Sequence, residues 1–235
     1  LLRVTAQAGD EEESAAREII ASKNATADKL LDGNSVSVGS ASRLYFDKMV
    51  ADLVGDNLYT ASELKAIRNY VTDNVTSYYN DRAGSQKVEL VYVLIPNSAT
   101  MYPEVLPEDI KAEIGTNNIY NQISEALSQT RATVVDMKKV FETAIADEEL
   151  MAKYGGLYRE TDSSLTDYGA YLPYREIMNV VAKNYPDAAP RTEDEFEWKT
   201  VDALGGNLVG YRGLDKNIIG EKLVTATPTF SLDIG

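Results

Sequence analysis

Cysteine and histidine are both absent from the 235 residues of this chain. Without cysteine, the sequence excludes a disulfide framework, a thiolate nucleophile and a cysteine-ligated zinc or iron–sulfur site. Without histidine, it lacks the usual general base at neutral pH and the commonest ligand of zinc, copper and non-haem iron. We therefore expect no cofactor and no resident metal; a metal that did bind would be a hard cation held by oxygen atoms.

Basic residues are also few, since 23 Lys and Arg stand against 37 Asp and Glu, for a net charge of −14. This balance argues against a nucleic-acid partner and against binding to an anionic membrane surface. No apolar run approaches eighteen residues, so we expect no transmembrane segment. The chain begins at Leu1 rather than Met, which is expected of a mature product from which a signal segment has been removed.

What is present indicates a globular α/β protein, with 44% hydrophobic and 26% charged residues. Residues 1–35 are expected to be a helical lead-in, and residues 36–185 an α/β domain. Residues 186–235, rich in Gly, Asp and Thr, are expected to be an irregular or β-containing segment of the same domain. The clearest helix start is at Thr60, because Thr60 and Glu63 have the spacing of a capping box.

Predicted strands and helices alternate between about residues 60 and 185, which favours a mostly parallel sheet. Residues 88–95 are nearly continuous in β-forming residues, typical of a strand buried on both faces. The predicted strands are 36–39, 43–46, 88–95, 133–137 and 157–160. The predicted helices start at Thr60 and span 118–129, 138–146 and, with Asp167 as the cap, 167–184.

Sequence motifs give mostly negative results. There is no G-x-G-x-x-G, Walker A, H-E-x-x-H or G-x-S-x-G sequence. In open α/β sheets, ligands bind beyond the carboxyl ends of the strands. Here those ends carry residues 96–98, 136–137 and 161–164. Their position suggests a site but names no reaction.

Three blocks of sequence stand out, at residues 43–60, 91–107 and 158–171. In this order they resemble the alginate O-acetyltransferase-like and DHHW proteins. Residues 43–48 and 57–60 are similar to G-x-L-F-Y/F followed by N-L-Y-T/S. Residues 91–107 resemble a strand, a P-N-K turn and a V/I-Y-P-E-x-L-P loop. Residues 158–171 are similar to Y-x-x-T-D-x-H-W-T-x-x-G-A, and Leu208 matches a G-D-L-A-like piece.

This resemblance implies an SGNH-hydrolase-like fold, flavodoxin-like with three layers, and transfer of acetyl groups to polysaccharide. The family uses a Ser nucleophile, a His base and an Asp that orients the His. By the match, Asp162 is the orienting Asp, Ser164 stands where the family has the catalytic His, and Leu165 stands where it has Trp. The family nucleophile lies in a Gly-Asp-Ser-like stretch, which we expect to fall beyond Gly235.

Asn97 and Tyr102 are the candidate substrate-binding residues. One interpretation is a polar contact from each to a bound sugar at the carboxyl edge of the sheet. The other is a Pro-Asn turn and an aromatic residue that covers the core. The chain has fifteen tyrosines, which would suit stacking on carbohydrate. Most are nevertheless expected in the core, because tyrosines fall on apolar faces at Tyr70, Tyr78, Tyr92 and Tyr174.

The resulting hypothesis is a catalytically degenerate SGNH-like protein of the bacterial cell envelope, secreted or attached to the surface. Its partner would be a polysaccharide or an envelope acetylation partner. Two alternatives stay open. One is an active O-acetyltransferase or acetylesterase whose nucleophile or base is not visible in this chain. The other is an acidic module that recruits a basic protein.

Overall fold

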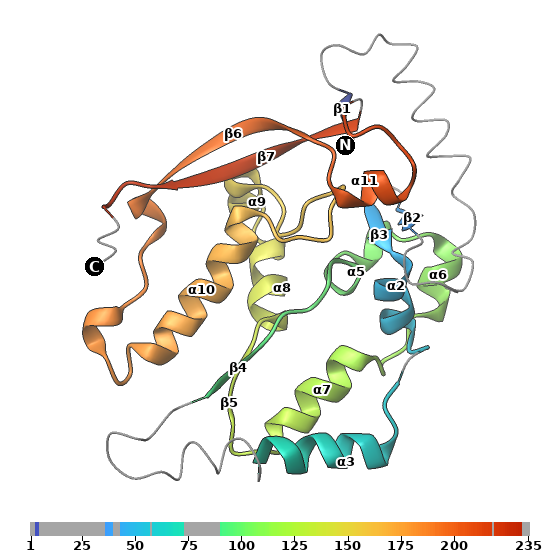
Figure 1. Cartoon of the computed structure of the whole chain (residues 1–235), viewed down its shortest axis with the longest axis vertical. Helices are drawn as coiled ribbons and strands as arrows, with labels where there is room; N and C mark the ends of the chain where they lie inside the picture. Colours follow the sequence, from blue (N-terminus) through green and yellow to red (C-terminus); the bar gives the residue numbers. More distant parts are fainter. Residues whose placement is uncertain are drawn as a thin grey trace.

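The computed structural model describes residues 3–4, 36–39, 43–56, 58–72, 90–217 and 219–231 (Figure 1). The strands are β1 (Arg3–Val4), β2 (Val36–Val38), β3 (Leu44–Phe46), β4 (Val91–Leu94), β5 (Thr133–Asp136), β6 (Phe196–Leu204) and β7 (Ile219–Pro228). The α-helices are α2 (Asp47–Val54), α3 (Ala61–Asn69), α5 (Ser98–Met101), α6 (Glu108–Glu113), α7 (Ile119–Ser128), α8 (Lys138–Ala146), α9 (Glu148–Tyr154), α10 (Asp167–Val181) and α11 (Asn207–Tyr211). Short 3₁₀ helices are η3 (Pro103–Val105), η4 (Pro186–Ala188) and η5 (Glu193–Glu195).

The strands form three small sheets. β6 and β7 make a long antiparallel ribbon, paired from Phe196 opposite Pro228 to Leu204 opposite Gly220. β1 pairs with the start of β7, and β2 pairs antiparallel with β3. β4 and β5 are parallel, as expected of an α/β unit. In Figure 1 the ribbon crosses one end of the molecule, beside α9 and the start of α10.

The expected mostly parallel sheet is seen only as the β4–β5 pair within the described ranges. β4 was also expected to be buried on both faces, and this is wrong: all four of its residues are only half-buried. Its side chains alternate between two sides of a two-stranded unit, so neither face is fully covered. The expected helix within residues 1–35 lies outside the described residues, and only β1 is placed there.

Local capping signals set the helix starts. Thr60 and Glu63 form the predicted capping box of α3, with the Glu63 carboxylate accepting from the Thr60 amide at 2.8 Å. The prediction that Asp167 caps α10 is wrong by one residue. Thr166 caps α10, and its hydroxyl accepts from the Gly169 amide at 3.1 Å, which places Asp167 in the first turn. The helix ends at Val181, three residues before the expected end.

The expected strand at 157–160 is instead a tight loop with one β-bridge, between Tyr158 and Leu165. Long-range contacts take up its backbone groups. The carbonyl of Arg159 accepts from the side chain of Arg43, and the carbonyl of Glu160 accepts from the Leu44 amide. These bonds leave the segment without a strand partner of its own.

Aromatic residues dominate the largest core cluster. Tyr154 of α9 stacks on Tyr168 of α10 with ring centroids 4.2 Å apart. The core also contains Met101, Met137, Phe141, Leu157, Tyr158 and Leu172. Tyr70, expected in the core, is 60% exposed at the end of α3. The 157–166 loop therefore packs against the aromatic core cluster, which fixes the position of the candidate site.

Candidate functional site

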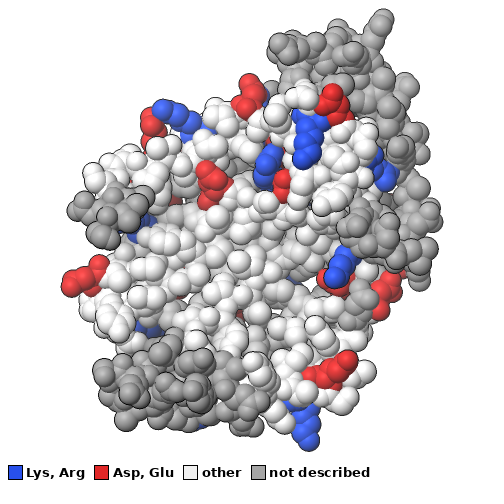
Figure 2. Space-filling model, viewed as in Figure 1, with Lys and Arg blue, Asp and Glu red and all other residues white. Residues whose placement is uncertain are grey.

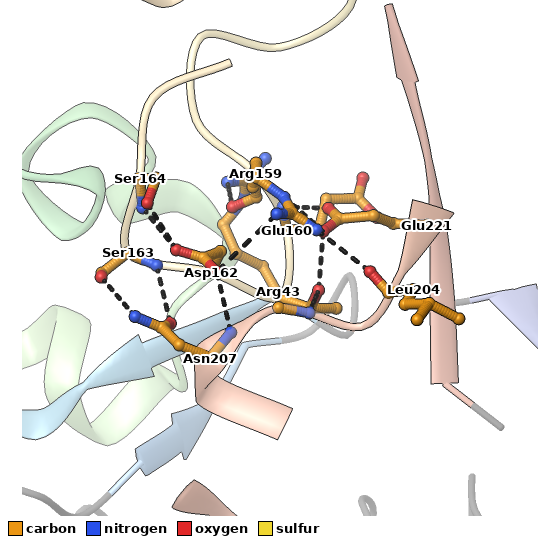
Figure 3. Close-up of polar contacts among 11 residues, drawn as sticks. Arg43, Arg159, Glu160, Asp162, Ser163, Ser164, Leu204, Asn207 and Glu221 are labelled. Carbon is orange, nitrogen blue, oxygen red and sulfur yellow. Dashed lines mark hydrogen bonds and ion pairs between the residues drawn. The ribbon is translucent and has the colours of Figure 1, made fainter. Parts of the chain in front are cut away.

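Asp162 is the centre of a polar network in the loop between α9 and α10 (Figure 3). The residue is only 8% exposed. One carboxylate oxygen accepts from the Ser164 amide at 3.0 Å and from the Ser164 hydroxyl at 2.6 Å. The other accepts from the Asn207 amide at 2.8 Å. Both oxygens are thus satisfied by neighbouring groups of the chain.

Ser164 lies at the outer edge of this network and is exposed. The bond from its amide to the Asp162 side chain, two residues back, is the contact that bends an Asx turn. This turn chemistry places the hydroxyl of residue 164 against the Asp162 carboxylate. The structure therefore brings Asp162 and Ser164 into direct contact, with the hydroxyl donating its proton to the carboxylate.

Asn207, the first residue of α11, closes the other side. Its side chain accepts from the Ser163 amide at 3.2 Å and donates to the Ser163 hydroxyl at 3.1 Å. The close approach needs a glycine before it. A Cβ on Gly206 would lie 2.5 Å from the Cβ of Asp162 and 2.5 Å from the Thr161 carbonyl oxygen. The backbone of α11 can bind Asp162 because residue 206 has no side chain.

The electrostatic balance keeps Asp162 ionised. Burial acts to raise the pKa of its carboxyl, because the charged form loses water. The hydrogen bonds from Ser164 and Asn207, together with the Arg159 guanidinium 3.8 Å away, outweigh burial and hold the pKa below its ordinary value. At neutral pH the carboxylate is thus a hydrogen-bond acceptor and a poor base.

A second, more buried network lies beneath it. Glu221 of β7 is 3% exposed and accepts from the Arg159 side chain at 2.8 Å. The same carboxylate accepts from the Thr161 hydroxyl at 2.8 Å and from the Glu160 amide at 2.9 Å. The Thr161 hydroxyl in turn accepts from the Gly206 amide. The carboxylate thus ties β7 to residues 159–161, and Thr161 extends the network to the segment before α11, which fixes the loop that carries Asp162.

Arg43 is the buried cation of the site and is 7% exposed. One nitrogen donates to the carbonyls of Tyr158 and Arg159, at 3.2 and 3.1 Å. Its guanidinium lies over the Tyr102 ring, 4.2 Å from the centroid. Arg43 thus joins the segment before β3 to the loop that leads to Asp162.

The two predicted substrate-binding residues hold local structure. The Asn97 side chain accepts from the amide and the hydroxyl of Thr100, at 2.9 and 3.1 Å, and so caps α5. Tyr102 is 9% exposed, and its hydroxyl accepts from the Leu157 amide at 2.9 Å. Neither has a direct contact with Asp162 in the described part of the chain. Tyr102 lies against the Arg43 guanidinium, which binds the Arg159 carbonyl.

Sequence reasoning missed Arg159, Asn207 and Glu221 as members of the site. The match at Leu208 lies one residue from Asn207, so a G-N-L reading of the G-D-L-A piece could have pointed to it. Glu221 offers no such signal, since it is one acidic residue in a run of β-forming residues. In the described ranges, no three acidic side chains are placed to hold a metal ion.

Replacing Asp162 by Asn is expected to lower the free energy of unfolding at pH 7 by about 1–3 kcal/mol, because one acceptor of an amide hydrogen bond is lost. The folded pKa lies below the unfolded value, so the ionised group stabilises the fold above about pH 4. That contribution is lost as pH falls through the folded pKa. Urea unfolding of both proteins between pH 7 and 3 should show the difference shrinking.

The matched control for this prediction is Asp202→Asn, since the Asp202 side chain is 85% exposed. We expect it to change the unfolding free energy by less than about 0.5 kcal/mol at every pH. A loss in Asp162→Asn that stays constant from pH 7 to 3 would contradict the role of the ionised carboxylate.

The fold and the site together define an α/β domain with an Asp–Ser pair in a loop held by long-range polar contacts. The family described as SGNH hydrolase-like domain, acetyltransferase AlgX, matches residues 58–228. The chain belongs to this family, which confirms the resemblance seen in the sequence and establishes an SGNH-like α/β fold. The expected three layers remain a prediction.

One of three similar solved structures supports the same fold at a TM-score above 0.5. The structure of Bacillus cereus PatB1 with a sulfonyl adduct aligns with a TM-score of 0.56 and 16% identity, over 85% of this chain and 57% of that one. The O-acetyltransferase domain of Pseudomonas putida AlgJ aligns with a TM-score of 0.48 and 18% identity, over 83% of this chain and 66% of that one. Pseudomonas aeruginosa AlgX aligns with a TM-score of 0.49 and 15% identity, over 83% of this chain and 44% of that one. The chain thus spans little more than half the length of PatB1. Among curated proteins, nothing matches.

Proposed function

We propose that this chain is a catalytically degenerate member of its family with a polysaccharide-associated role in the bacterial cell envelope. It would bind a glycan directly or support an acetylation partner. The observation that carries the proposal is the hydrogen bond from the Ser164 hydroxyl to Asp162, at the position where the resemblance expects a histidine base. An extracytoplasmic location and a polysaccharide partner are part of the same proposal.

The chemistry of Ser164 supports this reading. A triad histidine takes the nucleophile's proton near pH 7, whereas a serine hydroxyl has no basic site at that pH. Loss of the triad histidine in a serine hydrolase costs on the order of a million-fold in turnover, about 8 kcal/mol of barrier. Asp162 does not replace it, because its pKa is held below the ordinary value.

The alternative is a working acetyltransferase or acetylesterase that uses a base or nucleophile from other parts of the protein. The observation in favour of this alternative is the Asp162 carboxylate, which is ionised and held by several hydrogen bonds, as a group that orients a catalytic base must be.

The third hypothesis is an acidic surface that recruits a basic protein, and the face in Figure 2 does not support it. On that face the acidic and basic side chains of the described residues are spread around an uncharged centre.

The test is pre-steady-state release of nitrophenol from nitrophenyl acetate at micromolar protein, with Asp162→Ala as the control. We expect a trace equal to buffer for both proteins. A stoichiometric burst that disappears in Asp162→Ala would mean that an acyl-enzyme forms, and the degenerate assignment would be wrong.

Ser164→His tests the alignment in the same assay. If no nucleophile is available to the restored base, the variant is expected to match the parent chain. A gain of turnover by a hundred-fold or more, on the scale of general-base catalysis, would reveal a competent nucleophile and support the enzymatic alternative.

The helices in the described ranges include none that is both long enough and apolar enough to cross a bilayer.

A further inference from the structure

A cavity of about 860 Å³ lies between α10 and the end of the β6–β7 ribbon, away from Asp162. Its volume is within the range of pockets that take drug-sized ligands. Five aromatic side chains form most of its wall: Tyr171, Tyr174, Phe196, Trp198 and Phe230. Tyr171 is buried and the other four are half-buried. Part of their ring surface is thus available to a ligand.

The rings form one continuous aromatic surface. Tyr171 meets Trp198 edge-on at 6.3 Å and Phe196 at 5.8 Å, and Phe196 meets Phe230 at 5.7 Å. Edge-to-face contacts of this kind hold rings in fixed orientations. The aromatic wall is therefore pre-formed, which lowers the entropy lost when a flat apolar face binds to it.

Polar groups stand at the rim of the cavity. One carboxylate oxygen of Asp167 accepts from the Ala226 amide at 2.8 Å. Its other oxygen has no partner among the described residues and is free to accept. The Tyr174 hydroxyl accepts from the Arg191 amide at 2.9 Å and keeps its own proton to donate. The cavity thus joins an apolar wall to a few directed donors and acceptors.

The charges around the cavity argue against an anionic ligand. Arg191 is already paired with Glu195 at 2.8 Å, and its guanidinium covers Phe230 at 4.7 Å. Arg175 is paired with Glu176 and Glu193. Among the described residues that line the cavity, the other charged side chain is Asp167, whose carboxylate has no ion-pair partner there. Burial, and then the charge of Glu193, raise the pKa of Tyr171 to about 12, so its hydroxyl is neutral.

We propose that this cavity binds a neutral glycan, with the C–H face of a pyranose ring on the aromatic wall and its hydroxyl groups toward Asp167 and Tyr174. The inference rests on the proposed function, because that function supplies polysaccharide as the ligand class. A neutral sugar has one apolar face and a hydroxyl-bearing edge, which matches the two kinds of surface in the cavity. An anionic sugar would meet the unpaired Asp167 carboxylate.

The ribbon sets the distance from this cavity to the Asp162 network. Glu221 lies under the network and Ala226 lines the cavity, five residues apart on β7. At about 3.3 Å per residue, this separation is roughly 17 Å. The cavity is therefore a site separate from the Asp162 network.

The test uses Trp198, the single tryptophan of the chain, as its reporter. Its position in the cavity wall makes intrinsic fluorescence a direct readout of occupancy. The probes are cellotetraose and chitotetraose as neutral glycans and tetramannuronate as the anionic one, each titrated to on the order of 10 mM. We expect a saturable emission change with at least one neutral probe, and a weaker or absent change with tetramannuronate.

Two variants locate the binding. Phe230→Ala removes one ring of the wall and should lower the affinity for the neutral probe by about tenfold. Tyr185→Ala removes a ring that is 68% exposed and does not line the cavity, and this variant should bind the probe with the affinity of the parent chain. Near-ultraviolet circular dichroism, which reports the packed tyrosines, checks that Phe230→Ala is folded.

Three results would overturn the inference: no saturable change with either neutral probe, equal binding in folded Phe230→Ala, or tighter binding of tetramannuronate. The nitrophenol assay separates this test from that of the proposed function, since neither Asp162 nor Ser164 lines the cavity. A burst of nitrophenol from the parent would overturn degeneracy and leave the glycan site standing.

Discussion

Replacing Glu221 by Ala is expected to lower the free energy of unfolding by about 3 kcal/mol, because a buried carboxylate that accepts several hydrogen bonds is removed while Arg159 stays half-buried beside it. The Arg159 guanidinium would lose its closest carboxylate, 2.5 Å away. The Thr161 hydroxyl and the Glu160 amide would lose their acceptor as well. Urea unfolding at pH 7, followed by circular dichroism, measures the change.

Glu197→Ala is the matched control, because Glu197 lies on the same ribbon with a side chain that is 54% exposed and pairs with Lys199 at the surface. We expect a change of less than about 1 kcal/mol there. Glu221→Gln keeps the shape of the side chain and one acceptor oxygen, so its loss in the free energy of unfolding should lie between those of Glu221→Ala and Glu197→Ala. If Glu221→Ala costs no more than Glu197→Ala, the buried network does not hold the loop.

Gly169→Ala is expected to destabilise the protein by more than about 3 kcal/mol, although alanine is the better helix former. A Cβ at this position in α10 would lie 1.9 Å from the carbonyl oxygen of Leu157. That oxygen cannot retreat freely, because it accepts from the Thr166 amide at the start of the same helix. The loop or the helix must shift to make room, and thermal or urea unfolding will report the loss.

Gly210→Ala offers the opposite expectation within another helix. A Cβ on Gly210 would meet only the end of the flexible Lys216 side chain, at 3.1 Å. The substitution should be neutral or stabilising by up to about 1 kcal/mol, since alanine loses less backbone entropy in a helix. Equal stability of Gly169→Ala and the parent would show that the contact with Leu157 relaxes without cost.

The sequence predicted the elements whose signals are local. The capping box at Thr60 and the helix over residues 138–146 are both present, because caps and helical periodicity depend on residues three or four apart. The expected strand at 157–160 failed for the opposite reason. Its backbone carbonyls bind Arg43 and Leu44, and no local pattern carries information about partners so far along the chain.

The residues of the candidate site also fall into those that the sequence identified and those that it did not. Asp162 and Ser164 are two residues apart, so a motif could place them together, and the hydroxyl does contact the carboxylate. Asn207 and Glu221 reach the loop only through the tertiary fold, and their residue types alone did not identify them. Their roles follow from burial and hydrogen bonding, which a single sequence does not display.

The distant partners of the 157–166 loop also determine when the site can be completed during synthesis. Arg43 lies 115 residues before its partner Tyr158, whereas Glu221 follows Thr161 by 60 residues. At about 5–20 residues per second, a ribosome needs roughly 3–12 s to make the intervening chain. For that interval the emerging loop lacks its buried carboxylate, so a nascent chain halted before residue 221 should be open to proteolysis at this loop.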